Sequence, residues 1–226
     1  MWSIFEKMKI NIWSDIRCPF CYIGKRKFEQ ALEQFQHKDK VEVIWRSFQL
    51  DPGLKTQPGT KVFDYLAKIK GLTREESVQM HDHVTGVARE VGLSFQFENA
   101  VVANSFNGHR LIQLAKAQGL ASQAEEALFK AHFTDGKNID DEKTLLSIGT
   151  AIGLAEKDVS SLLASNDFSE AVKEDERMAR EIGIRGVPFF ILNDKFAVSG
   201  AQSPDAFLQA LEKAWEAQQA NPVKAS

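Results

Sequence analysis

The chain has 226 residues, 43% of them hydrophobic and 26% charged, a composition typical of a soluble globular protein with one large core or two small ones. Its formal net charge of -3 gives no basic surplus, which argues against nucleic acid and anionic membranes as partners. No segment is apolar over the roughly 18 residues that a membrane helix needs, and the N-terminal residues lack the apolar stretch of a secretory signal, so we expect a cytoplasmic protein with no membrane partner.

The first elements predict a βαβ unit. Residues 9–14 alternate between apolar and polar as a strand does, residues 24–35 have the spacing of an amphipathic helix, and residues 41–48 read as a second strand. A turn at Asp51-Pro52-Gly53 ends this strand. Because one helix connects the two strands, we expect them to be parallel.

From about residue 60 to residue 182 the sequence shows helical periodicity and no convincing strand. The predicted helices span residues 61–70, 74–91, 104–118, 123–133, 142–152, 156–164 and 169–182, and several of them stop at a glycine. We interpret the acidic run Glu174-Asp175-Glu176 as a solvated helix face.

Strand character returns at residues 187–192, and a turn at Asn193-Asp194 leads to a hairpin partner at residues 195–199. Ser203 and Pro204 then begin a last helix that runs to about residue 218. The predicted fold class is α/β, a thioredoxin-like fold with an inserted all-helical subdomain. Residues 8–58 and 183–219 form its discontinuous thioredoxin-like domain, residues 59–182 the helical insertion, and residues 220–226 a disordered tail.

The two cysteines, Cys18 and Cys21, lie in one Cys-Pro-Phe-Cys motif between the first strand and the first helix. A secreted disulfide scaffold would carry more cysteines, and a structural zinc site would need about four ligands. His81 and His83 lie two residues apart and therefore point to different faces of a helix, which we interpret as solvated. The motif thus predicts redox chemistry.

A helix N-terminus stabilises a thiolate through unpaired N–H groups and the helix dipole, so Cys18 is the predicted attacking thiol. Cys21, one turn further along, is the predicted resolving thiol that releases a mixed disulfide by exchange. Lys25, Arg26 and Lys27 either add positive potential or form a solvated helix face.

Gly186-Val187-Pro188 directly precedes the late strand. Thioredoxin-type folds have a cis proline there, beside the redox cysteines, and the backbone before it can pair with a peptide substrate as an added strand. We therefore predict a cis Pro188 and a substrate-binding role for Val187 and Pro188.

Five blocks of sequence resemble the FrnE-like branch of the DsbA family, in the order of that family. They are SDIRCPFCYIGK at 14–25, FQLDP at 48–52, HRLI at 109–112, GVPF at 186–189 and SGAQ at 199–202, and the resemblance extends from residue 9 to about residue 215. It implies a thioredoxin fold with inserted helices, a dithiol–disulfide active site, and no metal or organic cofactor. The Pro-Phe pair between the cysteines differs from the Pro-His of strongly oxidising periplasmic members, which suggests a milder oxidant, an isomerase or a reductase.

The same resemblance suggests further site residues. By the family layout, Asn104, His109 and Arg110 lie on a helix over the cysteine face, where His109 could shuttle protons or contact substrate. Asp15 either accepts a proton during exchange or, as we prefer, caps the cysteine helix. Aromatic residues are mostly core, although some could rim an apolar groove; this group comprises Trp45, Phe95, Phe97, Phe189 and Phe190.

Three functions fit these observations. The first is a dithiol–disulfide oxidoreductase that acts on protein or small-molecule thiols and disulfides. The second is a glutathione-dependent transferase or isomerase of the kappa-class or 2-hydroxychromene-2-carboxylate isomerase type, although those relatives have serine in place of Cys18 and an acidic residue that Gly200-Ala201-Gln202 lacks. The third is a non-catalytic chaperone. We prefer the first, with glutathione as one candidate substrate; the sequence leaves the oligomeric state open.

Overall fold

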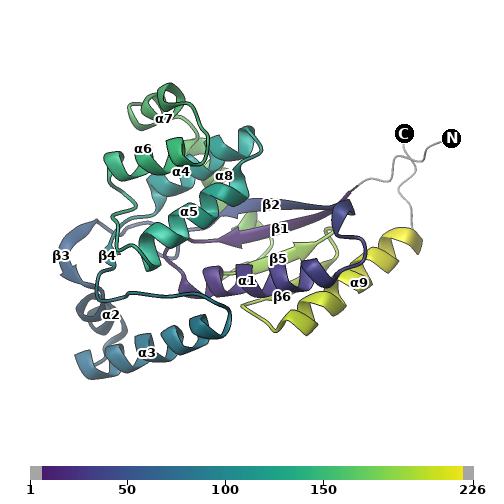
Figure 1. The fold of residues 1–226 in the computed structure, drawn as a ribbon, viewed down its shortest axis with the longest axis horizontal. Coiled ribbons are helices and arrows are strands. Elements are labelled where there is room, and N and C mark those ends of the chain that lie inside the picture. The colour runs from purple at the N-terminus through teal and green to yellow at the C-terminus, as the bar shows by residue number, and fades with distance from the viewer. Residues whose placement is uncertain (1–6, 221–226) are drawn as a thin grey trace.

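The computed structural model describes residues 7–220 and has a four-stranded mixed sheet in the order β2-β1-β5-β6 (Figure 1). β1 (Met8–Ser14) pairs in parallel with β2 (Val41–Ser47) and antiparallel with β5 (Phe189–Leu192), and β5 pairs antiparallel with β6 (Phe196–Ser199). Since α1 (Pro19–Gln34) connects β1 to β2, the predicted βαβ unit and the α/β fold class are confirmed.

Helices cover both faces of this sheet. Ile12 of β1 lies opposite Phe190 of β5, and the ring of Phe190 packs against Phe28 of α1 and Phe207 of α9 (Pro204–Ala220), with centroid distances of 5.5 and 4.6 Å. Side chains alternate along a strand, so Trp13 faces the other way and packs there with residues of α8 (Ser169–Glu181). The sheet is thus the middle layer of a sandwich between α1 and α9 on one side and α8 on the other.

Seven helices lie between β2 and β5, each within two residues of its predicted bounds. They are α2 (Val62–Lys70), α3 (Arg74–Glu90), α4 (Phe106–Ala117), α5 (Ala121–Phe133), α6 (Glu142–Ala151), α7 (Glu156–Leu163) and α8. In Figure 1, α4 to α8 gather on one side, and α2 and α3 form a separate pair near the beginning of α1. None of the helices between residues 7 and 220 combines the length and apolar character of a membrane span.

The helical segment is not free of strands, which corrects the prediction. β3 (Gln57–Lys61) and β4 (Val101–Val102) form a small antiparallel sheet that connects the segments flanking α2 and α3. A strand of two residues cannot show an alternating pattern, and its partner is polar and contains Pro58 and Gly59. At the other end of the chain, α9 extends to Ala220; the rest of the expected disordered tail lies outside the described residues.

The acidic run in α8 is only partly a solvated face, which is a second correction: Glu174 is exposed as expected, but Asp175 is buried. Asp175 is 2% exposed, and its carboxylate accepts hydrogen bonds from the Ser47 backbone N–H (3.0 Å), Arg46 (2.9 Å) and Gln113 (2.6 Å). Helical spacing places Asp175 on the same face as its buried neighbours three and four residues away. The charge is therefore buried where α8, β2 and α4 meet.

Candidate active site

The two cysteines lie at the start of α1, as predicted. Cys18 is the N-cap residue, Pro19 follows as the first helical residue, and Cys21 lies one turn further in. Cys18 is 5% exposed and Cys21 is 1% exposed, and both are free thiols. Burial raises the pKa of the Cys21 thiol well above its usual value, and its neighbour Cys18 adds to the effect. Cys21 is thus strongly held in the thiol form.

The structure brings Val187 and Pro188 to Cys18 across a long stretch of sequence. The Val187–Pro188 peptide bond is cis, and the Cys18 Sγ donates a hydrogen bond of 3.5 Å to the Val187 carbonyl oxygen. Gly24 permits this close approach, because a Cβ atom there would lie 2.9 Å from the Pro188 Cγ. The predicted neighbourhood of Cys18, Val187 and Pro188 is therefore present.

Asp15 does not cap the cysteine helix, contrary to our preferred interpretation. The N-cap of α1 has no side-chain hydrogen bond. The Asp15 carboxylate instead accepts from the backbone N–H groups of Arg17 (3.2 Å) and Leu50 (2.8 Å), so it joins the loop after β1 to the loop after β2. Its Oδ1 lies 3.5 Å from the Nε2 of His109, and both side chains are fully buried.

Asp15 and His109 form a coupled acid–base pair below the cysteine helix. Burial opposes both charged forms, but each group stabilises the charge of the other. The pKa of Asp15 is consequently lowered, with help from its backbone hydrogen bonds, and the pKa of His109 is raised. Neither ring nitrogen of His109 forms a hydrogen bond of good geometry with any of residues 7–220.

We expected Asn104 and His109 over the cysteine face; in the structure Asn104 binds loop residues, and His109 is buried beside Asp15. Asn104 precedes α4; its side chain accepts from the Phe106 N–H (2.7 Å) and from Gln49 (3.0 Å) and donates to the Leu54 carbonyl (2.7 Å). These bonds hold a loop. His109 is 0% exposed and therefore touches no substrate in this conformation.

The basic residues of α1 are paired rather than open to the cysteines. Lys25 and Arg26 both bind the Glu126 carboxylate of α5, which also accepts a 2.6 Å hydrogen bond from the Tyr22 hydroxyl. These donors outweigh the effect of burial and lower the pKa of Glu126 to about 2. Lys27 donates to the Ala201 carbonyl at 3.3 Å. The cluster anchors α1 to α5.

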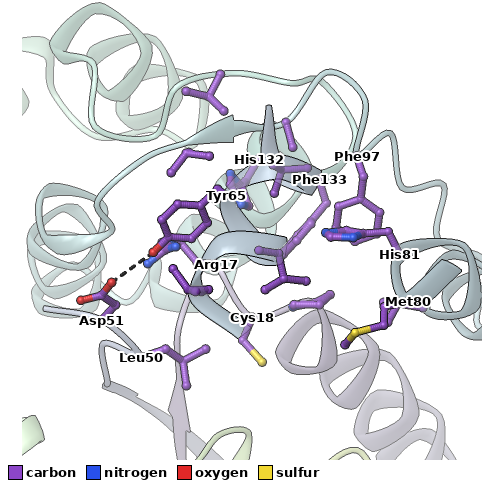
Figure 2. A pocket seen from close by; sticks show the side chains of 18 of the residues that line it. Arg17, Cys18, Leu50, Asp51, Tyr65, Met80, His81, Phe97, His132 and Phe133 are labelled. Atoms are coloured by element: carbon purple, nitrogen blue, oxygen red, sulfur yellow. Dashed lines mark hydrogen bonds between the residues drawn. The ribbon is translucent and has the colours of Figure 1, made fainter. Parts of the chain in front are cut away.

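A cavity of about 410 Å³ opens beside Cys18, which is one of its lining residues (Figure 2). Its wall is predominantly apolar and comes from the start of α1, from α2, α3 and β4, and from the end of α5. Sequence reasoning did not find this cavity. Phe97 was one of its aromatic candidates and does line it, whereas Phe95, Phe190 and Trp45 belong to the core.

His81 lines the cavity and is not a solvated residue of α3, which is a further correction. It is 7% exposed, and its ring lies between those of Phe63 and Phe97, with centroid distances of 4.8 and 4.6 Å. Its Nδ1 lies 2.7 Å from the Ser77 carbonyl oxygen and must donate to it. Burial lowers the pKa of His81, so the imidazole is neutral.

Comparison with known proteins gives a consistent result. The family model of the DSBA-like thioredoxin domain matches residues 9–212. An uncharacterized Bacillus subtilis protein, YwbO, is 28% identical over 207 residues, which are 89% of this chain and 94% of that protein.

Two solved structures extend the comparison. A probable DsbA oxidoreductase from Streptomyces coelicolor is 37% identical and superimposes with a TM-score of 0.89, covering 97% of this chain and 94% of the other. The cytosolic disulfide reductase DsbM from Pseudomonas aeruginosa has the same fold at 18% identity, with a TM-score of 0.64 over 92% of this chain and 99% of its own.

Proposed function

The chain belongs to the DsbA-like thioredoxin-domain family, and on that premise we propose that it is a thiol–disulfide oxidoreductase whose Cys18 and Cys21 alternate between dithiol and disulfide. The observation that carries the proposal is the contact of the Cys18 Sγ with the Val187 carbonyl, 3.5 Å away, at the N-terminus of α1. This contact gives an incoming disulfide both a nucleophile and a backbone edge to dock on.

The proposed cycle has two exchange steps. The Cys18 thiolate attacks one sulfur of a substrate disulfide, a mixed disulfide forms, and the other sulfur leaves as a thiolate. The Cys21 thiolate then attacks the sulfur of Cys18 and releases the second substrate thiolate. The protein is oxidised by two electrons and the substrate disulfide is reduced by two. The same steps in reverse oxidise a substrate dithiol.

Burial assigns different tasks to the two thiols. Because the pKa of Cys21 is raised, Cys21 stays protonated until the mixed disulfide has formed. It must lose its proton for the second step, in which the sulfur of Cys18 is only one helical turn away. We further propose the FrnE-like branch, a cytoplasmic location, and protein or small-molecule thiols and disulfides as partners, with no metal or organic cofactor.

Substitution of each cysteine tests the proposal. Cys18→Ser should abolish the reduction of insulin and of hydroxyethyl disulfide by the dithiothreitol-recycled protein. Cys21→Ala should retain the first exchange step and accumulate mixed disulfides, which appear as new bands on non-reducing gels and vanish with dithiothreitol. Full activity of a folded Cys18→Ser protein would refute the proposal.

The glutathione-dependent transferase or isomerase is less well supported. In residues 199–202, where those relatives have an acidic residue, Gln202 binds the Ser199 carbonyl (2.8 Å) and the Ala201 carbonyl accepts from Lys27. No carboxylate of this stretch is available to a glutathione amine. DsbM has itself been determined with GSH, so glutathione binding alone does not separate the two functions. Insulin reduction by the wild type, and its loss in the Cys18→Ser protein, is the test that separates them.

A further inference from the structure

We propose that the cavity beside Cys18 binds a low-molecular-weight thiol or disulfide that combines an apolar body with an anionic end group. The inference rests on the proposed function, since it names the substrate class of the same site. It is carried by three features of the cavity: an apolar rim, an uncharged interior, and a cation without a carboxylate partner at the mouth.

The rim is formed by large apolar side chains that are exposed to solvent. Among residues 7–220, five large hydrophobic side chains are exposed, and four of them line this cavity. The four are Phe20 (41% exposed), Leu50 (51%), Ile69 (57%) and Met80 (41%). Contiguous exposed apolar surface of this kind marks a binding site, because exposing it to water costs free energy. The fifth side chain, Ile182, lies outside the cavity.

The interior is apolar and uncharged at neutral pH. Two imidazoles line it. Burial, together with the nearby Arg17, lowers the pKa of His132 to about 4, and burial lowers the pKa of His81. The aromatic rings of Phe97 and Phe133 supply much of the remaining wall (Figure 2). The volume of about 410 Å³ falls in the range of roughly 300–1,000 Å³ that small-molecule sites occupy.

The cavity lining carries a positive charge on Arg17, the residue directly before Cys18. The guanidinium of Arg17 lies over the Tyr65 ring, 5.8 Å from its centroid, and no carboxylate within residues 7–220 forms an ion pair with it. The Asp51 carboxylate at the same rim instead accepts a 3.1 Å hydrogen bond from the Tyr65 hydroxyl. Lys70 adds a second cation to the lining. The rim thus has two cations and one engaged carboxylate, which complements an anion.

These features fix the orientation of the occupant. Arg17 directly precedes Cys18, so the anionic group and the reacting sulfur share one end of the site, while the apolar body enters between α2 and α3. For a thiol RSH, the chemistry is the reduction of the oxidised protein: two RSH and the Cys18–Cys21 disulfide give RSSR and the two cysteine thiols. Two electrons pass from the ligand sulfurs to the protein sulfurs, and the two thiol protons move to the cysteines.

Four thiols separate the contributions of charge and apolar body. They are meta-mercaptobenzoate, the uncharged meta-mercaptobenzamide, mercaptopropionate, which has the charge without the ring, and mercaptoethanol, which has neither. The measurement is the second-order rate constant for reduction of the oxidised wild-type protein by stopped-flow tryptophan fluorescence. Each constant is divided by the constant of the same thiol with hydroxyethyl disulfide, which removes intrinsic reactivity. We expect mercaptobenzoate to rank first.

Two variants and two matched controls assign that preference to the cavity. Arg17→Gln should lower the mercaptobenzoate constant about fivefold, as expected for a partly solvated charge pair, and change that of mercaptobenzamide by less than about twofold. Met80→Gln, on the exposed rim, should lower the rate constants of both aryl thiols several-fold and leave that of mercaptoethanol unchanged. Arg89 and Ile182 do not line the cavity, so Arg89→Gln and Ile182→Gln should change none of the four rate constants.

The outcomes are distinct from those of the proposed function. If no thiol reduces a wild-type disulfide, the oxidoreductase proposal fails. If thiols react but their corrected rate constants are equal, the substrate class is wrong and the oxidoreductase proposal stands. The same holds if Arg17→Gln lowers the rate constants of charged and uncharged thiols alike. The proposal is also overturned if an apolar peptide containing cysteine reacts faster than mercaptobenzoate and is indifferent to Arg17→Gln, because the cavity then serves polypeptides.

Discussion

Cys18 and Cys21 have different environments although only one helical turn separates them. Cys18 is the N-cap residue of α1 and lines the cavity, whereas Cys21 lies inside the helix, is 1% exposed and does not line the cavity. Thiolate reactivity therefore has to come from Cys18, since the pKa of Cys21 is raised by burial and by its neighbour.

We expect alkylation to report this difference. In the reduced protein at neutral pH, iodoacetamide should modify Cys18 at least about ten times faster than Cys21, because each pKa unit changes the thiolate fraction tenfold. Peptide mapping by mass spectrometry after timed quenching gives both rates. Cys21→Ala provides the Cys18 rate alone. Faster labelling of Cys21 would reverse the roles assigned to the two thiols.

Below the cysteines, a group of buried ionisable side chains makes folding dependent on pH. Glu125 is 1% exposed, and burial raises its pKa to about 7; burial also raises the pKa of Glu176. The pKa of His109 is raised, so its charged form stabilises the fold at pH values below the pKa of the unfolded chain. This stabilisation is lost as pH rises through the pKa of the folded protein. Asp15 has a lowered pKa, so its charged form stabilises the fold above the pKa of the unfolded chain, and this stabilisation is lost as pH falls through the lower folded value.

Glu125→Gln should therefore stabilise the protein at alkaline pH. The neutral carboxyl of Glu125 is favoured in the fold below the unfolded pKa near 4.5, and this advantage disappears as pH rises through about 7. An amide cannot ionise, so the variant should gain on the order of 2 kcal/mol in unfolding free energy at pH 8 and little at pH 5. Urea titrations at the two pH values measure this, with the exposed Glu90→Gln as control. Equal effects at both pH values would contradict a titrating Glu125.

At the scale of elements, the carboxylate of Asp175 connects α8, β2 and α4. Asp175 of α8 binds the backbone of β2 at Ser47, the guanidinium of Arg46 and the amide of Gln113 in α4, and its own carbonyl accepts from the Trp13 indole at 3.0 Å. The connection fixes α8 against the sheet face that carries Trp13, and α8 leads directly into the segment containing Val187 and Pro188. The contacts of Asp175 therefore help to position the segment that contains Val187 and Pro188.

Removal of this carboxylate should be costly. Asp175→Ala leaves the half-buried guanidinium of Arg46, the buried amide of Gln113 and the buried N–H of Ser47 without their acceptor, so we expect a loss of about 3 kcal/mol in unfolding free energy. Asp175→Asn retains one acceptor oxygen and should cost less. Glu174→Ala, at the exposed neighbouring position, should cost less than about 1 kcal/mol. Chemical denaturation of the three variants measures the series; equal losses for positions 174 and 175 would show that the buried network contributes nothing.

Elements that are periodic along the chain could be predicted, and those that depend on distant partners could not. The helices follow from a local repeat, and the Cys18–Cys21 pair and Pro188 follow from local motifs. The β3–β4 pairing joins segments some forty residues apart, and the burial of Asp175 and His81 is decided by partners on other elements. The cavity was missed for the same reason, because its wall comes from several separate segments of the chain.

At the scale of the whole molecule, the predicted division into a thioredoxin-like domain and a helical insertion follows the order of the chain, and it remains a prediction about folding units. The main apolar core does not follow that boundary. Ile12 and Phe28 of the predicted thioredoxin-like part share one cluster with Leu111 and Leu128 of the insertion. Trp45 of β2 also donates a 2.9 Å hydrogen bond to Ser122 of α5.

A shared core predicts that both parts unfold together. Leu128 is 0% exposed in α5, and Leu128→Ala should cost about 2–5 kcal/mol through the lost contacts and the cavity left behind. Far-UV circular dichroism reports mostly the helices of the insertion, and tryptophan fluorescence reports the thioredoxin-like part through Trp13, Trp45 and Trp215. In urea, the two signals should give one midpoint for the wild type and one lower midpoint for the variant, since a single cooperative unit has a single transition. If the insertion folded by itself, Leu128→Ala would lower the dichroism midpoint and leave fluorescence unchanged. One apolar cluster joins β1, α1, α4 and α5, so loss of its packing should destabilise both parts equally. Coincident transitions in the two signals would demonstrate this.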